Sequence, residues 1–352
     1  MLPKRFTALD CVRGVAAIAV VLFHYSQLEG EVWLRRGWLA VDVFFCLSGF
    51  VIAHNYQRKL EQGMSFIAFA RKRLSRLYPL YLFALILGAL TFLGTLEEHR
   101  AVSTAGIVRA LLLGVVALPY LNEMVVSDGE GNIEGALFPL NDPAWSLFFE
   151  LFVNVLFFLL LAMRFKKFWV LMALGALGYL VMAKWHGLNA GWDTETFIVG
   201  FPRVIYSFFA GVLIYRLRDT TVVTPSFYGL LAVAAMVTAF VLPPSPWISI
   251  ACVLVVGPLV IWVNSGVTPG PRLASTGLFL GWISYPLYIT HVPIYRVLSM
   301  LEPDEGWSAP DWLVILASTA VAIVAAWSAA RLDDAFRTFL ADRRSKGTRI
   351  AS

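Results

Sequence analysis

The sequence predicts an all-α protein, a polytopic bundle of membrane-spanning helices, and three observations carry that prediction. Of the 352 residues, 59% are hydrophobic and only 14% are charged, and the mean hydropathy is +0.72. Apolar runs long enough to cross a bilayer, which takes about 20 residues, recur from end to end. Lysines and arginines concentrate in alternate loops, as they do on the cytoplasmic side of membranes. The net charge of +5 includes no basic block of the nucleic-acid-binding type.

We expect about ten transmembrane helices, with both termini cytoplasmic because that orientation keeps the basic loops inside. The predicted spans cover residues 10–28, 38–56, 77–95, 144–162, 168–184, 197–215, 226–242, 247–263, 277–299 and 312–330. These spans form one transmembrane domain, residues 1–335, followed by a basic cytoplasmic tail, residues 336–352.

One further apolar segment, residues 105–121, does not fit the alternation of charge. If it crossed the membrane, the later acidic loop would lie inside and the later basic loop outside. We therefore expect a short helix that dips into the outer face of the bilayer or lies along it.

The first predicted span carries two residues that a lipid-facing helix should not hold, Arg13 and His24. Eleven positions of an α-helix make three turns plus roughly 20°, so the two side chains share one face about 16 Å apart. Ionisable groups inside a span usually mark a functional path. The spacing therefore predicts a route between these two residues.

Four more polar residues are expected in the outer half of the bundle. Asp42 should lie at the depth of His24, and a carboxylate holding one imidazole nitrogen would make the other a better base. The same two residues could instead only lock two helices together. His291, with Tyr288 one turn earlier, is either a packed core residue or a substrate ligand. Glu150 and Arg203 either form a mutual ion pair or bind a polar substrate.

Arginines crowd the predicted inner half. Arg71, Arg73 and Arg76 precede the third span, and Arg13 stands at the start of the first. Guanidinium groups pair bidentately with phosphate, so the cluster could bind a nucleotide-bearing donor. As positive-inside residues alone, they would need no further role. No metal site is expected, because the three cysteines lack ligand spacing.

Five blocks in order carry a resemblance to a known family. They read LDCVRGVAAIAVVLFH, VDVFFCLSGFVI, RKRLSRLYPLY, WSLFFE and ISYPLYITH, and together they span residues 9–291. The chain resembles the integral-membrane acyltransferase 3 family, which O-acylates polysaccharides. The resemblance implies ten core spans, an essential histidine at His24, an arginine at Arg13 and a cytoplasmic acyl-CoA donor. The fourth block lacks the family's extended SVEEQFY-like continuation.

The resulting hypothesis is a bacterial inner-membrane O-acyltransferase. It would move an acyl group, most simply acetyl, from acyl-CoA to a hydroxyl of an extracytoplasmic or lipid-linked saccharide. His24 and Asp42 would be catalytic. The donor would be bound by Arg13, Arg71, Arg73 and Arg76, and the acceptor by Glu150, Arg203, His291 and Tyr288. Direct transfer and a covalent acyl-protein intermediate both remain open. A sugar transporter using the same polar path is the alternative, although no inverted repeat is evident.

Overall fold

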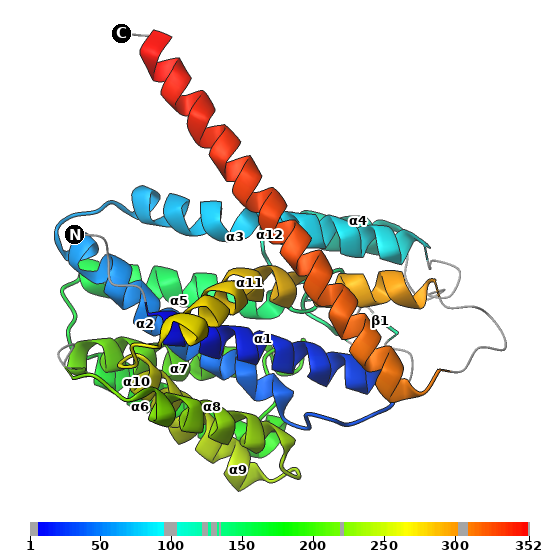
Figure 1. Cartoon of the computed structure of the whole chain (residues 1–352), viewed down its shortest axis with the longest axis horizontal. Helices are drawn as coiled ribbons and strands as arrows, with labels where there is room; N and C mark the ends of the chain where they lie inside the picture. The colour runs from blue at the N-terminus through cyan, green and yellow to red at the C-terminus, as the bar shows by residue number, and fades with distance from the viewer. Residues whose placement is uncertain are drawn as a thin grey trace.

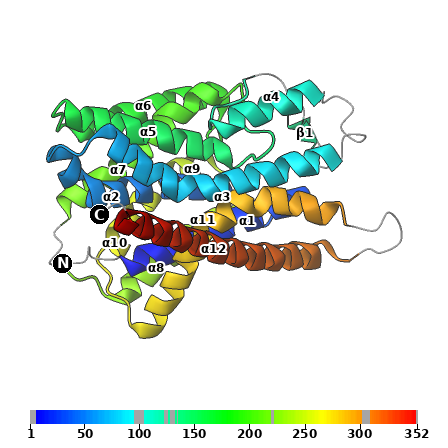
Figure 2. The ribbon, with the colours of Figure 1, turned by 90° about the horizontal axis from the view of Figure 1, so that it is seen from above.

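The computed structural model describes residues 6–94, 104–121, 126–127, 132–133, 135–218, 222–301 and 309–350. The long helices run roughly side by side in one bundle (Figures 1 and 2). In order they are α1 (Thr7–Leu28), α2 (Ala40–Glu61), α3 (Phe66–Gly94), α4 (Thr104–Val115), α5 (Ala144–Ala162), α6 (Phe168–His186), α7 (Phe197–Leu217), α8 (Ser226–Val241), α9 (Pro246–Ala251), α10 (Gly257–Asn264), α11 (Pro271–Ser299) and α12 (Asp311–Ile350).

Short elements complete the chain. A 3-10 turn, η1 (Gly37–Leu39), leads into α2, and a π-helical turn, η2 (Cys252–Val256), joins α9 to α10 into one rod. A two-residue antiparallel pair, β1 (Val126–Ser127) with β2 (Asn132–Ile133), is the one sheet that the described residues contain.

The predicted polytopic helical membrane protein is confirmed. Within the described residues, eight helical segments are long and apolar enough to cross a bilayer. The two remaining predicted spans correspond to α8, which has 16 residues, and to α11, which has 29. Each of the ten predicted spans therefore coincides with a helix or, for residues 247–263, with the α9–η2–α10 rod.

Helix α3 begins eleven residues before the predicted start of the third span, at residue 66 rather than 77. Ser65 caps its first turn, since its side-chain oxygen accepts a hydrogen bond from the Ala68 amide at 3.3 Å. The interval of residues 57–76 between the second and third predicted spans is therefore mostly helical, because α2 also continues to Glu61. The arginines lie on the first turns of a helix, where their side chains have fixed directions.

Helix α4 enters the bundle without crossing it. Its 12 residues extend about 18 Å, well short of a bilayer core of about 30 Å. Its last turn reaches the middle of α3, where Tyr81 donates a hydrogen bond to the Gly114 carbonyl at 2.5 Å. Ala117 then takes a left-handed conformation, φ 54°, and the chain turns back. The short helix expected within residues 105–121 is therefore present, and whether it dips into the outer face or lies along it stays a prediction.

Close helix contacts are made where glycine leaves room. A side chain at Gly14 of α1 would overlap Leu280 of α11, and one at Gly49 of α2 would overlap the Phe208 carbonyl of α7. Small residues let helix backbones approach closely in membranes. These contacts bring α1 against α11 and α2 against α7, the four helices that hold most of the candidate site.

The predicted boundary at residues 335/336 falls inside a continuous helix. Helix α12 runs to Ile350, and its C-terminal part projects beyond the bundle (Figure 1). Pro79 in α3 cannot donate to the Ser75 carbonyl, and Arg337 of α12 donates to that carbonyl instead, at 2.7 Å. The α12 extension is thus anchored on α3.

Candidate active site

Two histidines from opposite ends of the sequence face each other in the bundle. The ring centroids of His24 on α1 and His291 on α11 lie 5.2 Å apart, with the ring planes at 43°. His291 is fully buried, and His24 is partly exposed. Because α1 and α11 pack closely against each other, the helix contact itself holds the two rings together.

The hydrogen bonds of His291 determine which of its nitrogens is basic. Its Nδ1 lies 2.7 Å from the backbone oxygen of Tyr288. A carbonyl oxygen only accepts, so Nδ1 carries the proton and Nε2 keeps its lone pair. Among the described residues, that buried Nε2 has no hydrogen-bond partner. Tyr25 donates to the His291 carbonyl at 2.8 Å and holds this turn of α11 in place. An unprotonated nitrogen therefore lies in the ring beside His24.

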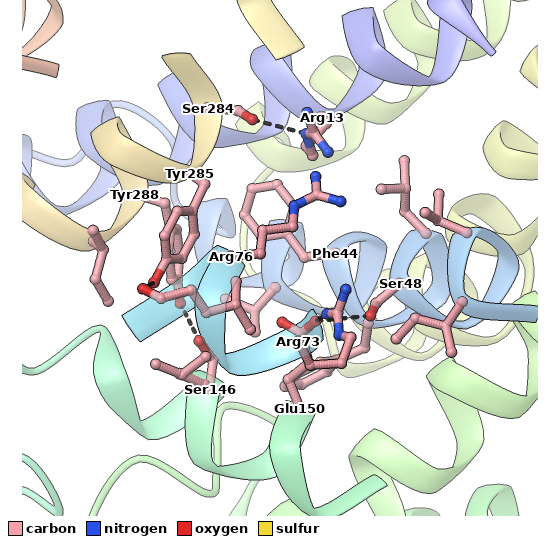
Figure 3. Close-up of a pocket in the computed structure, with 18 residues that line it drawn as sticks. Arg13, Phe44, Ser48, Arg73, Arg76, Ser146, Glu150, Ser284, Tyr285 and Tyr288 are labelled. Atoms are coloured by element: carbon pink, nitrogen blue, oxygen red, sulfur yellow. Dashed lines mark hydrogen bonds and ion pairs between the residues drawn. The ribbon is translucent and has the colours of Figure 1, made fainter. Parts of the chain in front are cut away.

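Two cavities lie near this pair and share part of their lining. We call them inner and outer after the orientation predicted from the sequence. The inner cavity, of about 110 Å³, is lined by Arg13, and the outer cavity, of about 410 Å³, is lined by His24. Val41 and Tyr288 line both cavities. The Tyr288 hydroxyl is 2.7 Å from the Ser146 hydroxyl, which holds the ring in position (Figure 3). The side chains of Val41 and Tyr288 therefore lie between the inner cavity, which contains arginine, and the outer cavity, which contains His24.

Glu150 lies in the inner cavity and pairs with Arg73. Arg73 Nη2 is 2.5 Å from Glu150 Oε1, and the Ser48 hydroxyl donates to the same oxygen at 3.0 Å (Figure 3). The mutual ion pair between Glu150 and Arg203 considered from the sequence is therefore not formed. The carboxylate of α5 is matched by a cation from α3, which the longer α3 helix carries into the bundle.

The remaining arginines of the predicted cluster divide into two kinds. Arg13 and Arg76 both line the inner cavity. Arg13 donates to the Ser284 hydroxyl at 2.8 Å, and in Figure 3 Arg76 lies between Arg13 and Arg73. Arg71 is exposed and is not among the residues that line the cavity. The helix that carries them explains the division, since Arg73 and Arg76 are three residues apart and share a face of α3.

Asp42 does not hold His24, and that prediction is wrong. Its carboxylate accepts three hydrogen bonds from Arg203, Nε to Oδ1 at 3.0 Å and to Oδ2 at 3.3 Å and Nη2 to Oδ2 at 2.7 Å, and one from the Ser207 hydroxyl at 3.3 Å. The Asp42 and Arg203 side chains are 4% and 0% exposed. A guanidinium offers two parallel donors to a carboxylate where an imidazole offers one, so the arginine of the closely packed α7 is the better partner.

The Arg203–Asp42 pair shapes the wall of the outer cavity. The Arg203 guanidinium lies over the rings of Trp38, at 5.2 Å, and Trp145, at 5.5 Å. Both indoles line the outer cavity. Arg203 also donates to the Ala190 carbonyl at 2.7 Å. The buried cation therefore fixes two aromatic surfaces that face the space beside His24.

The outer cavity also holds a carboxyl group that the sequence analysis did not single out. Asp142 lines this cavity, and its Oδ1 is buried without a hydrogen-bond partner among the described residues. Burial raises the pKa of Asp142 to about 6, while the nearby charge of Arg296 acts in the opposite direction. In the sequence, an aspartate before a proline at a helix start is typical of an ordinary cap, so no local signal pointed to it.

The sequence did contain a signal for the His24–His291 pair. Both residues were placed in the outer halves of their spans, so counting depth along each helix could have paired them. What the sequence lacked was the order of the helices around the bundle, which puts the eleventh helix against the first. The sequence does not show that α11 packs against α1, and for that reason it predicts Asp42 rather than His291 as the partner of His24.

The fold and this site together describe an integral-membrane helical bundle with two facing imidazoles and two cavities. The sequence profile of the acyltransferase domain family (Acyl_transf_3) matches residues 6–331, and the chain belongs to that family. It is therefore a membrane-bound acyltransferase and not the sugar transporter considered above. No solved structure matches the chain.

Two curated relatives show how far the similarity extends. Over 165 residues the chain is 41% identical to Protein 2 in the picA locus of Rhizobium radiobacter, which covers 44% of this chain and 82% of that protein. Over 94 residues it is 36% identical to the O-acetyltransferase OatA of Staphylococcus aureus, which covers 26% of this chain and 14% of OatA. The chain thus spans a small part of the length of OatA.

Proposed function

We propose that this acyltransferase moves an acetyl group from acyl-CoA, bound from the cytoplasm, to a hydroxyl of an extracytoplasmic or lipid-linked saccharide. The observation that carries the proposal is the meeting of the two cavities: a chamber with arginines and a chamber with His24 share the side chains of Val41 and Tyr288. A donor held on one side and an acceptor held on the other would meet at the histidine pair.

Arg13 and Arg76 are suited to hold the donor's phosphates. Both line the inner cavity, and guanidinium groups recognise phosphate oxygens with paired hydrogen bonds. Arg73 pairs with Glu150 and Arg13 pairs with Asp10, so a carboxylate already offsets part of the charge of each of these two arginines. The pantetheine arm would extend from these arginines and bring its thioester toward His24. Arg13 and His24 lie roughly 16 Å apart along one face of α1.

His24 is the general base of the proposed reaction. It takes the proton of the acceptor hydroxyl while that oxygen attacks the thioester carbonyl carbon. The new bond is the C–O bond of the ester, and the C–S bond breaks, so CoA leaves as a thiolate that takes up a proton. The ring of His291 lies beside that of His24, and the lone pair on its Nε2 stabilises the positive charge that His24 gains with the proton. Direct transfer is the simpler course, since it uses only the groups that line these cavities.

Relatives and composition support the remaining parts of the proposal. The name of OatA is that of an O-acetyltransferase, which supports acetyl as the acyl group and oxygen as its acceptor. The R. radiobacter and S. aureus relatives support a bacterial host. Lysines and arginines concentrate in alternate loops, and this distribution supports the cytoplasmic placement of both termini.

The test uses purified protein in lipid nanodiscs with radiolabelled acetyl-CoA and a panel of oligosaccharides. Wild-type protein should release CoA and label an acceptor, and His24→Ala should do neither while unfolding at the same temperature. His186→Ala, which removes an exposed histidine at the end of α6, is the matched control and should behave as wild type. Full turnover in the His24→Ala variant would overturn the proposal.

Incubation with acetyl-CoA alone distinguishes the two courses of transfer. Direct transfer predicts that the intact mass of the protein stays unchanged until an acceptor is added. A stable increase by one acetyl group, lost on adding the acceptor, would instead establish an acyl-protein intermediate.

A further inference from the structure

The outer cavity is built from flat aromatic walls and uncharged or acidic polar groups. Trp38, Trp145 and Trp192 line it together with Asn189 and Asp142. The indole of Trp192 donates to the Asn189 carbonyl at 3.3 Å, and the other two indoles are held by Arg203. Rigid aromatic faces beside a few polar groups are suited to a ring with an apolar face and a polar edge.

Asp142 is held rigidly at the wall of this cavity. The Ala144 amide donates to the Asn141 carbonyl at 3.0 Å and the Trp145 amide to the Asp142 carbonyl at 3.2 Å, which fixes the turn that opens α5. Pro143 restricts the backbone between them. The backbone of Asp142 is therefore fixed at the cavity wall.

The buried Oδ1 atom of Asp142 lacks a partner that its chemistry demands. Leaving a buried acceptor unpaired costs about 1–3 kcal/mol, and more when the group is charged. No hydrogen bond from the described residues reaches this atom. A hydroxyl group of a bound ligand, donating to Oδ1, would remove that cost, and a carboxylate or phosphate of a ligand could not.

The charge of the cavity agrees with this preference. Asp142 and Glu31 line it, and no lysine or arginine is among its described lining residues. Arg203 is fully buried against Asp42, and Arg296, whose charge acts on Asp142 itself, donates to the Pro139 carbonyl at 3.1 Å. An anionic ligand would therefore lose its water without gaining a cation.

We infer that the outer cavity takes a neutral sugar ring whose second hydroxyl donates to Asp142 Oδ1 while the reacting hydroxyl meets His24. Asp142 is then a positioning and specificity-determining residue that excludes uronic acids and phosphorylated sugars. The inference rests on the proposed function, since it names the acceptor class of the same site.

The experiment measures acetylation of matched oligosaccharides that differ only in carrying a hexose or the corresponding uronic acid. The nanodisc-embedded wild type should favour the neutral acceptor by about tenfold or more in kcat/KM. Asp142→Ala should raise KM for the neutral acceptor by about tenfold, the loss of one hydrogen bond to a charged group, and leave KM for acetyl-CoA unchanged. Asp142→Asn keeps an acceptor oxygen without the charge, so it should retain neutral-acceptor binding and lose most of the discrimination against the uronic acid.

A purely structural role for Asp142 would lower activity toward both acceptors alike and would not change their ratio. His186→Ala, at an exposed position outside the cavity lining, is the control and should leave the ratio unchanged. The inference is overturned if wild type acetylates the uronic acid as readily as the hexose, or if Asp142→Asn leaves the ratio unchanged. Absence of acetylation of every acceptor by wild type would instead refute the proposed function.

Discussion

His24 and His291 have their ring centroids 5.2 Å apart, and His291 donates from Nδ1 to the Tyr288 carbonyl. This bond leaves Nε2 of His291 as a buried base with no hydrogen-bond partner among the described residues. It lies in the ring next to His24, the proposed general base. Two neutral imidazoles can share one proton, whereas two protonated ones would repel each other in a buried setting. A second proton on the pair therefore carries a high cost.

Replacing His291 with alanine should lower kcat by about a hundredfold, within the range that positioned proton-transfer groups contribute. KM for acetyl-CoA should stay near its wild-type value, because His291 does not line the donor's arginine chamber. The double variant His24→Ala/His291→Ala should be no slower than His24→Ala alone, since residues that act as a unit are not additive.

Steady-state kinetics of the three variants beside His186→Ala give this comparison directly. Multiplication of the two single effects in the double variant would show that the histidines act independently. An unchanged kcat in His291→Ala would reduce His291 to a packing residue.

Asp42 and Arg203 should govern stability rather than chemistry. Removing one partner of a buried ion pair leaves an uncompensated charge and costs about 3–5 kcal/mol. Asp42→Leu and Arg203→Met should each lower the unfolding midpoint strongly, and the double variant should recover part of the loss, because no lone charge then remains buried. Thermal unfolding in detergent provides the measurement.

The opposite pattern would restore the role for Asp42 that the sequence suggested. In that case Asp42→Asn would slow turnover at an unchanged unfolding midpoint, as expected of a residue that only orients the imidazole of His24.

Arg76 should bind the phosphates of the donor, and Arg71 should not. Arg76→Gln should raise KM for acetyl-CoA by about tenfold, the loss of a charge-assisted contact. Arg71→Gln is the matched control, since this exposed side chain stands outside the lining of the inner cavity. The thioester of acetyl-pantetheine, which lacks the nucleotide and its phosphates, should be used equally by wild type and Arg76→Gln. Equal KM changes in the two arginine variants would indicate a general effect of surface charge.

Much of the fold could be predicted from the sequence because each span carries its own signal. Apolar length gives the helices, and the distribution of arginine and lysine gives their alternation. Even the short helix within residues 105–121 could be predicted, since the charges on either side exclude a crossing. The start of α3 could not be placed, because a basic amphipathic helix and a basic loop have similar composition, and only the Ser65 cap distinguishes them.

The candidate site could be predicted less completely, for a different reason. Arg13 and His24 share one helix, so their relation follows from helical geometry alone. The partners of Asp42, Glu150 and Arg203 depend on which helices are neighbours, and antiparallel order along the chain does not decide this in a bundle. Asp142 was missed because its unpartnered atom is a property of the cavity and not of any local motif.

The pH dependence of stability should reveal the buried carboxyl group of Asp142. Burial raises its pKa to about 6 from its ordinary 3.8, so the folded protein binds a proton that the unfolded chain has already released. The stabilising effect of that proton is complete below about pH 4 and is lost as the pH rises through about 6. The unfolding temperature of wild type should therefore fall across this interval more than that of Asp142→Asn, which has no proton to lose.

The comparison between variants isolates Asp142 from the groups around it. The charge of Arg296 lowers its pKa and that of Asp193 raises it, and His24 and Glu31 line the same cavity. These groups are the same in both proteins, so their contributions cancel in the difference between the two unfolding curves. Parallel curves from pH 4 to pH 6 would mean that Asp142 titrates at its ordinary value, and hence that water or another partner reaches Oδ1.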